Sequence, residues 1–403
     1  MVPRKLFNSN RNCTLKKFFP LFLLFFGFVP VQARAVVDVN SLKNNSYIFA
    51  KQKYNALSKK YYLKKYPFVT NDKGEWKFTG PSGWTSGFFP GSLWFIYEQT
   101  KEETWKKKAR EWQKALTSQK NNKETHDIGF IIYSSFGNDY RLTGNITSKN
   151  ILLSAAKTLA TRYDPKIQAI RSWNSDAPRY EVIMDNMMNL QLLFWSSKNG
   201  GDRNLYNIAL NHALKTQKDF IRSDGSVYQL VVYNQANGKI MGKSNPQGFS
   251  PNSVWSRGQA WAIYGFANVY KETGNKSFLQ TARKTANYFI NNLPSDNIPY
   301  WDFKAPKKAL QPKDSSAAAV AASGLIKLSC LEISNYNKIK YRQVAERILN
   351  SLSTKYLDND GQSLLSQGTY NKNMGEFNVG TSWGDYYFLE GLGNINKSCT
   401  DIW

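Results

Sequence analysis

Apolar residues recur every three to four positions through most of the chain after Ser41, with polar residues between them. This spacing is typical of amphipathic helices that bury one face. No extended alternation of apolar and polar residues, which a half-buried strand would show, competes with it. The pattern predicts about twelve helices, at residues 43–65, 87–100, 102–119, 127–141, 147–163, 180–198, 203–221, 255–272, 276–292, 314–334, 337–356 and 383–395.

The connectors between these helices alternate between short and long. Two of the short ones are near-copies, Tyr140-Arg-Leu-Thr-Gly-Asn145 and Tyr270-Lys-Glu-Thr-Gly-Asn275. A glycine just past one helix, followed by a polar residue that opens the next, is typical of a tight helical hairpin. Six such hairpins predict an all-α fold, an (α/α)6 barrel, and an open helical solenoid is the structural alternative. In the barrel all long connectors share one end; they are residues 66–86, 164–179, 222–254, 293–313 and 357–382.

One segment carries an acid where the pattern predicts a buried helix. Within Tyr180–Leu193 the apolar residues repeat at helical spacing, and the same face continues to Phe194. Asp185 lies near the N-terminal end of this predicted helix. A carboxylate there is either a helix cap or a group whose pKa is shifted by apolar neighbours. The pattern alone leaves both interpretations open.

The N-terminal segment has the pattern of a secretory signal peptide. Basic residues precede an apolar run from Phe18 to Val31, and small residues follow it. We expect cleavage near Ala33 or Ala35, which removes residues 1–35 and leaves a single domain at 36–403. The apolar run is too short and too interrupted by proline for a membrane span. The sequence therefore predicts export, with the periplasm as the expected compartment and no stable membrane insertion.

The charge balance indicates an anionic partner. The chain has 54 Lys and Arg against 29 Asp and Glu, and loss of the six basic residues in the signal segment lowers its formal net charge from +25 to +19. The basic residues are scattered, and no nucleic-acid-binding motif is present, so nucleic acid is not an expected partner. An acidic glycan fits an exported basic protein. The 15% aromatic content fits stacking on sugar rings as well as an ordinary core.

Few residues are available for cysteine or histidine chemistry. Cys330 and Cys399 remain after signal removal, and their spacing does not decide whether they pair. His126 and His212 are the only histidines, too few for a His-rich metal site or for a mechanism with paired histidines. We expect His212 to be a surface or packing residue of an amphipathic helix. The composition thus excludes a disulfide scaffold and disfavours a His-based metal centre.

Chemically distinctive residues gather where a predicted helix follows a long connector. They are Trp84 and Phe88, His126 and Asp127, Asp185, Trp255, Arg257 and Trp261, Asp314, and Trp383 and Asp385. In a barrel whose long connectors share one end, these residues converge on one mouth. Aspartate is also a favoured helix cap, an interpretation that applies above all to Asp314 and Asp385. Capping does not account for the Trp, Phe and Arg residues beside the acids, so we predict a site at this mouth.

Asp127 and Asp185 are candidates for an acid–base pair of the kind that cleaves glycosidic bonds. Apolar neighbours would raise the pKa of Asp185 and keep its proton near neutral pH, whereas Asp127, with His126 beside it, would stay charged. Arg257 offers a bidentate contact to a substrate carboxylate. The expected wall of a sugar subsite is aromatic, with Trp84, Phe88, Trp173, Trp255 and Trp261 as candidates.

Five blocks of sequence, in this order, resemble glycoside hydrolase family 88, the unsaturated glucuronyl hydrolases. They are Trp84-Thr-Ser-Gly-Phe-Phe-Pro-Gly91, His126-Asp-Ile-Gly-Phe130, Met184-Asp-Asn-Met-Met-Asn189, Trp255-Ser-Arg-Gly-Gln-Ala-Trp-Ala-Ile-Tyr-Gly265 and Trp383-Gly-Asp-Tyr-Tyr387. The resemblance implies an (α/α)6 barrel, active-site aspartates at Asp127 and Asp185, and no metal or organic cofactor. It also implies substrate contacts at Trp84, Phe88, Gln247, Trp255, Arg257 and Trp261.

The resemblance further implies the substrate and the chemistry. The substrate is an oligosaccharide left by a polysaccharide lyase, with a 4,5-unsaturated uronic acid at its non-reducing end. Its C4=C5 bond is hydrated: Asp185 protonates C4 and assists the addition of water at C5, while Asp127 positions the sugar. Gln229 stands where the family's substrate-contacting His is expected, which keeps hydrogen bonding but loses a chargeable ring. Glycosaminoglycan fragments and sulfated, ulvan-type fragments are therefore both expected substrates.

Two other functions remain open on the sequence. The related unsaturated rhamnogalacturonyl hydrolases, which act on pectin fragments, carry a similar Trp-Ser-Arg-Gly-Gln-Ala-Trp stretch. A non-catalytic acidic-glycan-binding protein on the same scaffold would keep Arg257 and the aromatic residues but need not retain both Asp127 and Asp185. The presence of both acids favours an enzyme. An epimerase on this scaffold would need a pair of histidines that the chain lacks.

Overall fold

The predicted succession of helices is present in the computed structural model, which describes residues 38–60 and 64–402. The predicted signal peptide lies outside these residues, so its cleavage near Ala33 or Ala35 and the 36–403 domain stay predictions. The α-helices are α1 Val39–Lys60, α2 Phe88–Thr100, α3 Glu103–Lys114, α4 Asn138–Thr143, α5 Ile146–Ala160, α6 Asn186–Lys198, α7 Asn204–Phe220, α8 Ser256–Thr273, α9 Lys276–Asn291, α10 Ser315–Leu331, α11 Asn335–Lys355 and α12 Ser382–Asn394.

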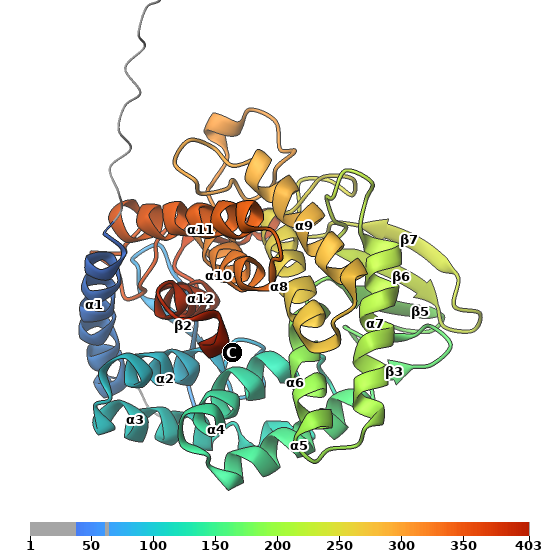
Figure 1. Cartoon of the computed structure of the whole chain (residues 1–403), viewed down its shortest axis with the longest axis horizontal. Coiled ribbons are helices and arrows are strands. Elements are labelled where there is room, and N and C mark those ends of the chain that lie inside the picture. The colour runs from blue at the N-terminus through green and yellow to red at the C-terminus, as the bar shows by residue number, and fades with distance from the viewer. Residues whose placement is uncertain (1–37, 61–63, 403) are drawn as a thin grey trace, which may run out of the picture. The chain divides into compact units, whose positions relative to one another are not determined.

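The helices form a closed double ring (Figure 1). Neighbours in the inner ring pack in the order α2, the π-helix η2 Gly129–Gly137, α6, α8, α10 and α12, and α12 packs back against α2. The other long helices pack outside them, for example α9 on α8 and α11 on α10. Because α12 contacts α2, the ring is closed, which shows the (α/α)6 barrel and not the open solenoid.

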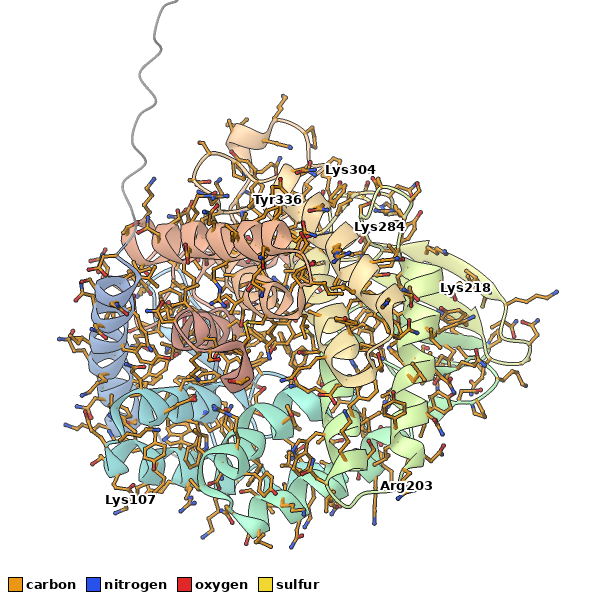
Figure 2. All side chains as sticks on the ribbon, viewed as in Figure 1. Lys107, Arg203, Lys218, Lys284, Lys304 and Tyr336 are labelled. Carbon is orange, nitrogen blue, oxygen red and sulfur yellow. A yellow bond between two sulfur atoms is a disulfide. The ribbon has the colours of Figure 1, made fainter. Side chains whose placement is uncertain are left out.

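Burial separates the two rings. Residues Ser315–Ser329 of α10 are buried on every side, as expected of a helix with neighbours all around it. The outer helices α3, α7 and α9 instead bury one face and turn basic residues outward, among them Lys107, Lys218 and Lys284 (Figure 2). The core therefore lies between the rings and inside the inner one.

The two near-identical short connectors form the tight turns that the sequence predicts. Gly144 and Gly274 adopt left-handed backbone with φ of 70° and 68°, and each N–H bonds the carbonyl four residues back. Asn145 and Asn275 then cap α5 and α9, because each side chain accepts a backbone N–H at 3.0 Å. These hairpins are specified locally.

The long connectors contain short strands, which the periodicity did not predict. The strands are β1 Tyr66–Thr70, β2 Trp76–Thr79, β3 Tyr163–Asp164, β4 Ala169–Ile170, β5 Arg179–Ile183, β6 Leu230–Asn234, β7 Ile240–Ser244, β8 Gly368–Asn371 and β9 Glu376–Val379. All pair antiparallel, and β5, β6 and β7 form a three-stranded sheet. At two to five residues each, they are too short to alternate visibly, and β6 is buried on both faces over its first four residues.

Two predicted helices need correction. The segment 180–198 is not one helix: its first residues belong to β5, which pairs with β6 from Arg179 opposite Asn234 to Ile183 opposite Leu230. A partner strand about 50 residues away in the chain therefore overrides local periodicity there. The segment 127–141 is the π-helix η2 followed by α4. Wide helical turns of this kind are often found at functional sites.

The open question of the cysteines is answered. Cys330, near the end of α10, forms a disulfide with Cys399 in the C-terminal segment. Within residues 38–60 and 64–402, no helix is long and apolar enough to cross a membrane.

Candidate active site

The long connectors and the starts of the inner helices enclose a cavity of about 270 Å³. Six of the predicted site residues line it, namely Trp84, Asp127, Trp173, Asp185, Gln247 and Arg257. Four others do not line it, namely Phe88, Gln229, Trp255 and Trp261, and all four are fully buried. The structure therefore brings the predicted residues together in two layers, one facing the cavity and one supporting it.

Asp185 lies between the end of β5 and the first residue of α6. Its side chain makes no cap hydrogen bond, and its Oδ2 is buried without a hydrogen-bond partner among the described residues. Burial, followed by the charge of Asp127, raises the pKa of Asp185 from 3.8 to about 7. Arg257 and the indole of Trp261 lower it in part, although Trp261 does not reach hydrogen-bond geometry. The side chain of Asp185 is therefore not a cap of α6, and burial favours its protonated form.

Asp127 has similar surroundings, contrary to the expectation that it stays charged. Burial raises its pKa from 3.8 to about 7, against the lowering effect of Thr125, whose hydroxyl donates to Oδ2 at 3.2 Å. The Nε2 atom of His126 lies 3.4 Å from the same oxygen, but burial and the charge of Arg162 lower the pKa of His126 to about 3. A neutral imidazole supplies no charge to hold Asp127 ionised. The charge of Asp127 in turn raises the pKa of Asp185, so the ionisation of one acid affects the other.

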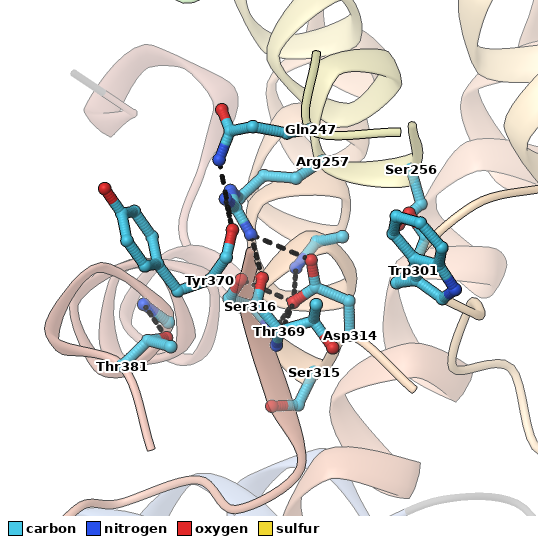
Figure 3. A network of polar contacts seen from close by, with 12 residues as sticks. Gln247, Ser256, Arg257, Trp301, Asp314, Ser315, Ser316, Thr369, Tyr370 and Thr381 are labelled. Atoms are coloured by element: carbon cyan, nitrogen blue, oxygen red, sulfur yellow. Dashed lines mark hydrogen bonds and ion pairs between the residues drawn. The ribbon is translucent and has the colours of Figure 1, made fainter. Parts of the chain in front are cut away.

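The guanidinium of Arg257 is held by the protein on one side (Figure 3). Nη1 pairs with Oδ2 of Asp314 at 3.0 Å and donates to the carbonyl of Thr369, and Nη2 donates to the carbonyl of Tyr370 at 2.7 Å. Trp255 stacks on it with 4.5 Å between Cζ and the ring centroid. These bonds use three of its five N–H donors, and no bond among the described residues uses the other two.

Asp314 and Asp385 have structural roles, as the capping interpretation expects of Asp314. The Oδ1 of Asp314 accepts the backbone N–H groups of Ser316 and Ala317 at the start of α10. Asp385 instead accepts the backbone N–H groups of Leu364 and Leu365 at 2.9 and 3.0 Å. Neither acid lines the cavity.

Aromatic side chains form the floor and one rim of the cavity. Trp84 packs against Trp383 with ring centroids 4.9 Å apart. Phe88 packs edge-on against Trp84, with 5.9 Å between their ring centroids. Trp261 supports the same cluster from below through Phe130. Trp173, on the connector before β5, keeps 39% of its surface exposed at the rim. Of the five aromatic residues predicted to wall a sugar subsite, Trp84 and Trp173 reach the cavity, and the other three are buried behind it.

Sequence reasoning did not single out two cavity residues on the β8–β9 hairpin, Tyr370 and Asn371. Tyr370 matters most, because its carbonyl accepts from Arg257 and also from Nε2 of Gln247 at 3.0 Å. The available signal was the position of the hairpin in the long connector 357–382, at the predicted mouth. Among the described residues, no group of three or more His, Cys, Asp or Glu is placed to hold a metal ion.

Comparison with known proteins agrees with this arrangement. The model of a family described as Glycosyl Hydrolase Family 88 matches residues 51–396. An unsaturated glucuronyl hydrolase of Formosa agariphila is 43% identical over 320 residues, 77% of this chain and 79% of that protein. An unsaturated chondroitin disaccharide hydrolase of Streptococcus agalactiae is 31% identical, over 85% of this chain and 89% of that one. The crystal structure of an unsaturated glucuronyl hydrolase specific for heparin matches with a TM-score of 0.85 at 34% identity, over 88% of this chain and 97% of that one.

Proposed function

Because the chain belongs to glycoside hydrolase family 88, we propose that it removes a 4,5-unsaturated glucuronic acid from the non-reducing end of acidic oligosaccharides. The observation that carries the proposal is the pair of partly buried acids at one cavity, with the buried Oδ2 of Asp185 unused by the described residues. A proton donor to carbon must hold its proton near neutral pH and keep an oxygen free, and a pKa of about 7 meets the first condition.

The proposed chemistry is hydration of the C4=C5 bond. Protonated Asp185 gives its proton to C4, and a water molecule adds at C5, passing a proton back to the carboxylate. The product is a hemiketal, which opens and breaks the glycosidic bond. Asp127 positions the sugar, and when it is ionised its charge raises the pKa of Asp185. Because no step occurs by displacement at the anomeric carbon, the spacing of the two carboxyls does not predict a stereochemical outcome.

The cavity also supports an anionic terminal sugar. Arg257 lines it with two uncommitted N–H donors, and a uronate carboxylate is the planar partner that a guanidinium prefers. The two carboxyls would disfavour an anion if both were charged, but their raised pKa keeps them largely neutral below pH 7. The names of the similar proteins favour a glucuronyl substrate over the rhamnogalacturonyl alternative and over a non-catalytic role.

The natural source of the oligosaccharide belongs to the proposal as well. Glycosaminoglycan fragments are supported by the chondroitin- and heparin-directed relatives. Sulfated fragments, including ulvan-type ones, are supported by the net positive charge of the chain. Screening lyase products of chondroitin, hyaluronan, heparin, ulvan and pectin ranks these sources by kcat/KM.

Replacing the proposed proton donor tests the function directly. The wild-type protein should remove the ultraviolet absorbance of the conjugated uronate from lyase-generated disaccharides. Asp185→Asn should lower kcat by about 10²–10⁴-fold, because an amide cannot donate the proton. The matched control is Asp72→Asn, the same change at an exposed position. A folded Asp185→Asn protein with the wild-type rate on the best substrate would disprove the assignment of the donor.

We also propose that the protein is exported to the periplasm. The support is the signal-like pattern of residues 1–35 and the disulfide between Cys330 and Cys399, since such bonds persist in oxidising compartments. The partner that we expect it to bind in the periplasm is the oligosaccharide substrate.

A further inference from the structure

Gln229, predicted to contact substrate, lies behind the cavity wall and is fully buried. Its backbone connects two parts of the site: its carbonyl accepts the N–H of Met184, next to Asp185, at 2.8 Å, and its N–H donates to Asn245 at 2.9 Å. Its side chain makes two bonds to one residue. Its Oε1 accepts the backbone N–H of Gln247 at 2.9 Å, and its Nε2 donates to Oε1 of Gln247 at 2.6 Å.

These bonds determine how both side-chain amides are oriented. A backbone N–H is always a donor, so the atom of Gln229 that meets the N–H of Gln247 must be the oxygen. A backbone carbonyl is always an acceptor, so the atom of Gln247 that meets the carbonyl of Tyr370 must be the nitrogen. The bond between the two side chains then joins a donor to an acceptor. The backbone N–H of Gln247 and the carbonyl of Tyr370 therefore require the same orientation of the two amides, and neither amide can be flipped without losing a hydrogen bond.

The orientation matters because Gln247 lines the cavity. One N–H of its amide is used by the carbonyl of Tyr370, and no bond among the described residues uses the other. The same carbonyl also receives Nη2 of Arg257 (Figure 3). Arg257 and Gln247 therefore lie side by side at one wall, and each nitrogen that bonds Tyr370 keeps a second N–H, an arrangement that suits an acceptor with two oxygens.

We infer that Gln229 is a positioning residue that makes Gln247 a hydrogen-bond donor to the carboxylate of the terminal sugar, beside Arg257. Gln229 does not touch the sugar itself. Its carboxamide holds the carboxamide of Gln247 with the nitrogen toward Tyr370 and the cavity. This inference rests on the proposed function, because that function supplies the uronate carboxylate.

The substitution Gln229→Glu changes one donor into an acceptor at almost constant shape. One oxygen of the introduced carboxylate would still accept the N–H of Gln247, but the other would face Oε1 of Gln247. The amide of Gln247 would then turn its nitrogen to the new carboxylate and its oxygen toward Tyr370 and the sugar. We expect KM to rise about tenfold or more with kcat within about twofold, the size of one lost hydrogen bond to a charged group.

Three further variants make the experiment specific. Gln229→Met, which can neither donate nor accept, should raise KM in the same direction, and it serves if Gln229→Glu does not fold. Gln235→Glu makes the same chemical change at the turn after β6, outside the cavity lining, and should leave KM unchanged. In a Gln247→Ala background, Gln229→Glu should have no further effect on KM, because the positioned group is gone.

If the wild-type protein is active, two results with the variants would overturn the inference. One is an unchanged KM in both Gln229 variants. The other is that Gln229→Glu raises KM by the same tenfold in the Gln247→Ala background, which would indicate a general structural role. Calorimetry of disaccharide binding, with the Gln229 and Gln247 variants made in the inactive Asp185→Asn protein, gives the same comparison in terms of Kd. If wild-type protein neither binds nor consumes any unsaturated uronide, the proposed function fails, and the inference falls with it.

Discussion

At the scale of single residues, the aspartates at or near starts of inner helices have different roles because of what meets their oxygens. Backbone N–H groups bind Oδ1 of Asp314 and both oxygens of Asp385, Arg257 binds Oδ2 of Asp314, and both acids are structural. Asp185 keeps a buried oxygen without a partner among the described residues. A shifted pKa does not separate the two kinds, because burial also raises the pKa of Asp385, to about 8. Unused hydrogen-bonding capacity next to a cavity is the more informative signal.

The raised pKa values predict how stability depends on pH. An aspartate with a folded pKa of about 7 favours folding while it is protonated, and this contribution is lost as pH rises from 3.8 through 7. Asp185→Asn should therefore have a larger free energy of unfolding than wild type at pH 8, by about 2–4 kcal/mol, with the gain shrinking toward pH 5.

Urea unfolding at the two pH values measures this difference. Asp72→Asn, which changes an exposed acid, should show no such trend. A gain for Asp185→Asn that is the same at pH 5 and pH 8 would contradict the assignment of a raised pKa.

At the scale of elements, short and long connectors are specified differently. The Thr-Gly-Asn turns form from residues within the turn, whereas the β8–β9 hairpin is placed by distant residues. Arg257 on α8 binds the carbonyls of Thr369 and Tyr370, and Asp314 before α10 binds Arg257 and the N–H of Thr369. Two inner helices thus hold the hairpin that forms one wall of the cavity.

Asp314 is therefore expected to be costly to replace. Asp314→Ala removes the cap of α10 and leaves the guanidinium of Arg257 buried without its ion pair, so unfolding should become easier by about 3–5 kcal/mol. Asp314→Asn keeps the oxygen that caps α10, so its loss of unfolding free energy should measure only the contribution of the ion pair with Arg257.

Thr381→Ala is the control for a cap without an ion pair, because the Thr381 side chain accepts the N–H of Gly384 at the start of α12. It should cost only about 1 kcal/mol. Equal losses in Asp314→Ala and Thr381→Ala, measured by denaturant unfolding, would show that the ion pair contributes nothing.

At the scale of the whole molecule, the barrel is closed by noncovalent packing and tied at its C-terminal end by one covalent bond. The contact of α12 with α2 closes the inner ring. The disulfide joins α10 to the segment after α12 across 69 residues. Lysines on the outer helices, among them Lys107, Lys218 and Lys284, face outward and do not line the cavity, so we expect their charge to attract anionic oligosaccharides in general (Figure 2).

Export and the disulfide are tested together on protein recovered from the periplasm. Its intact mass should lack the segment up to Ala33 or Ala35 and, before reduction, should be lighter by two hydrogens. Cys330→Ala with Cys399→Ala should lower the free energy of unfolding by about 4 kcal/mol, from the length of the loop that the bond closes. The activity of this folded variant at room temperature should stay unchanged, because neither cysteine lines the cavity. Free thiols in the exported protein would contradict the pairing.

The sequence by itself determined most of the helices, their pairing into hairpins and six of the residues that line the cavity. It could do so because amphipathic periodicity, glycine turns and asparagine caps act over a few residues, and because the blocks around Asp127, Asp185 and Arg257 resemble a known family. Only the tertiary structure decided that Tyr180 to Ile183 form a strand, that His126 is neutral and that Gln229 supports Gln247 from behind. Each depends on partners or burial supplied by distant parts of the chain, which local pattern does not contain.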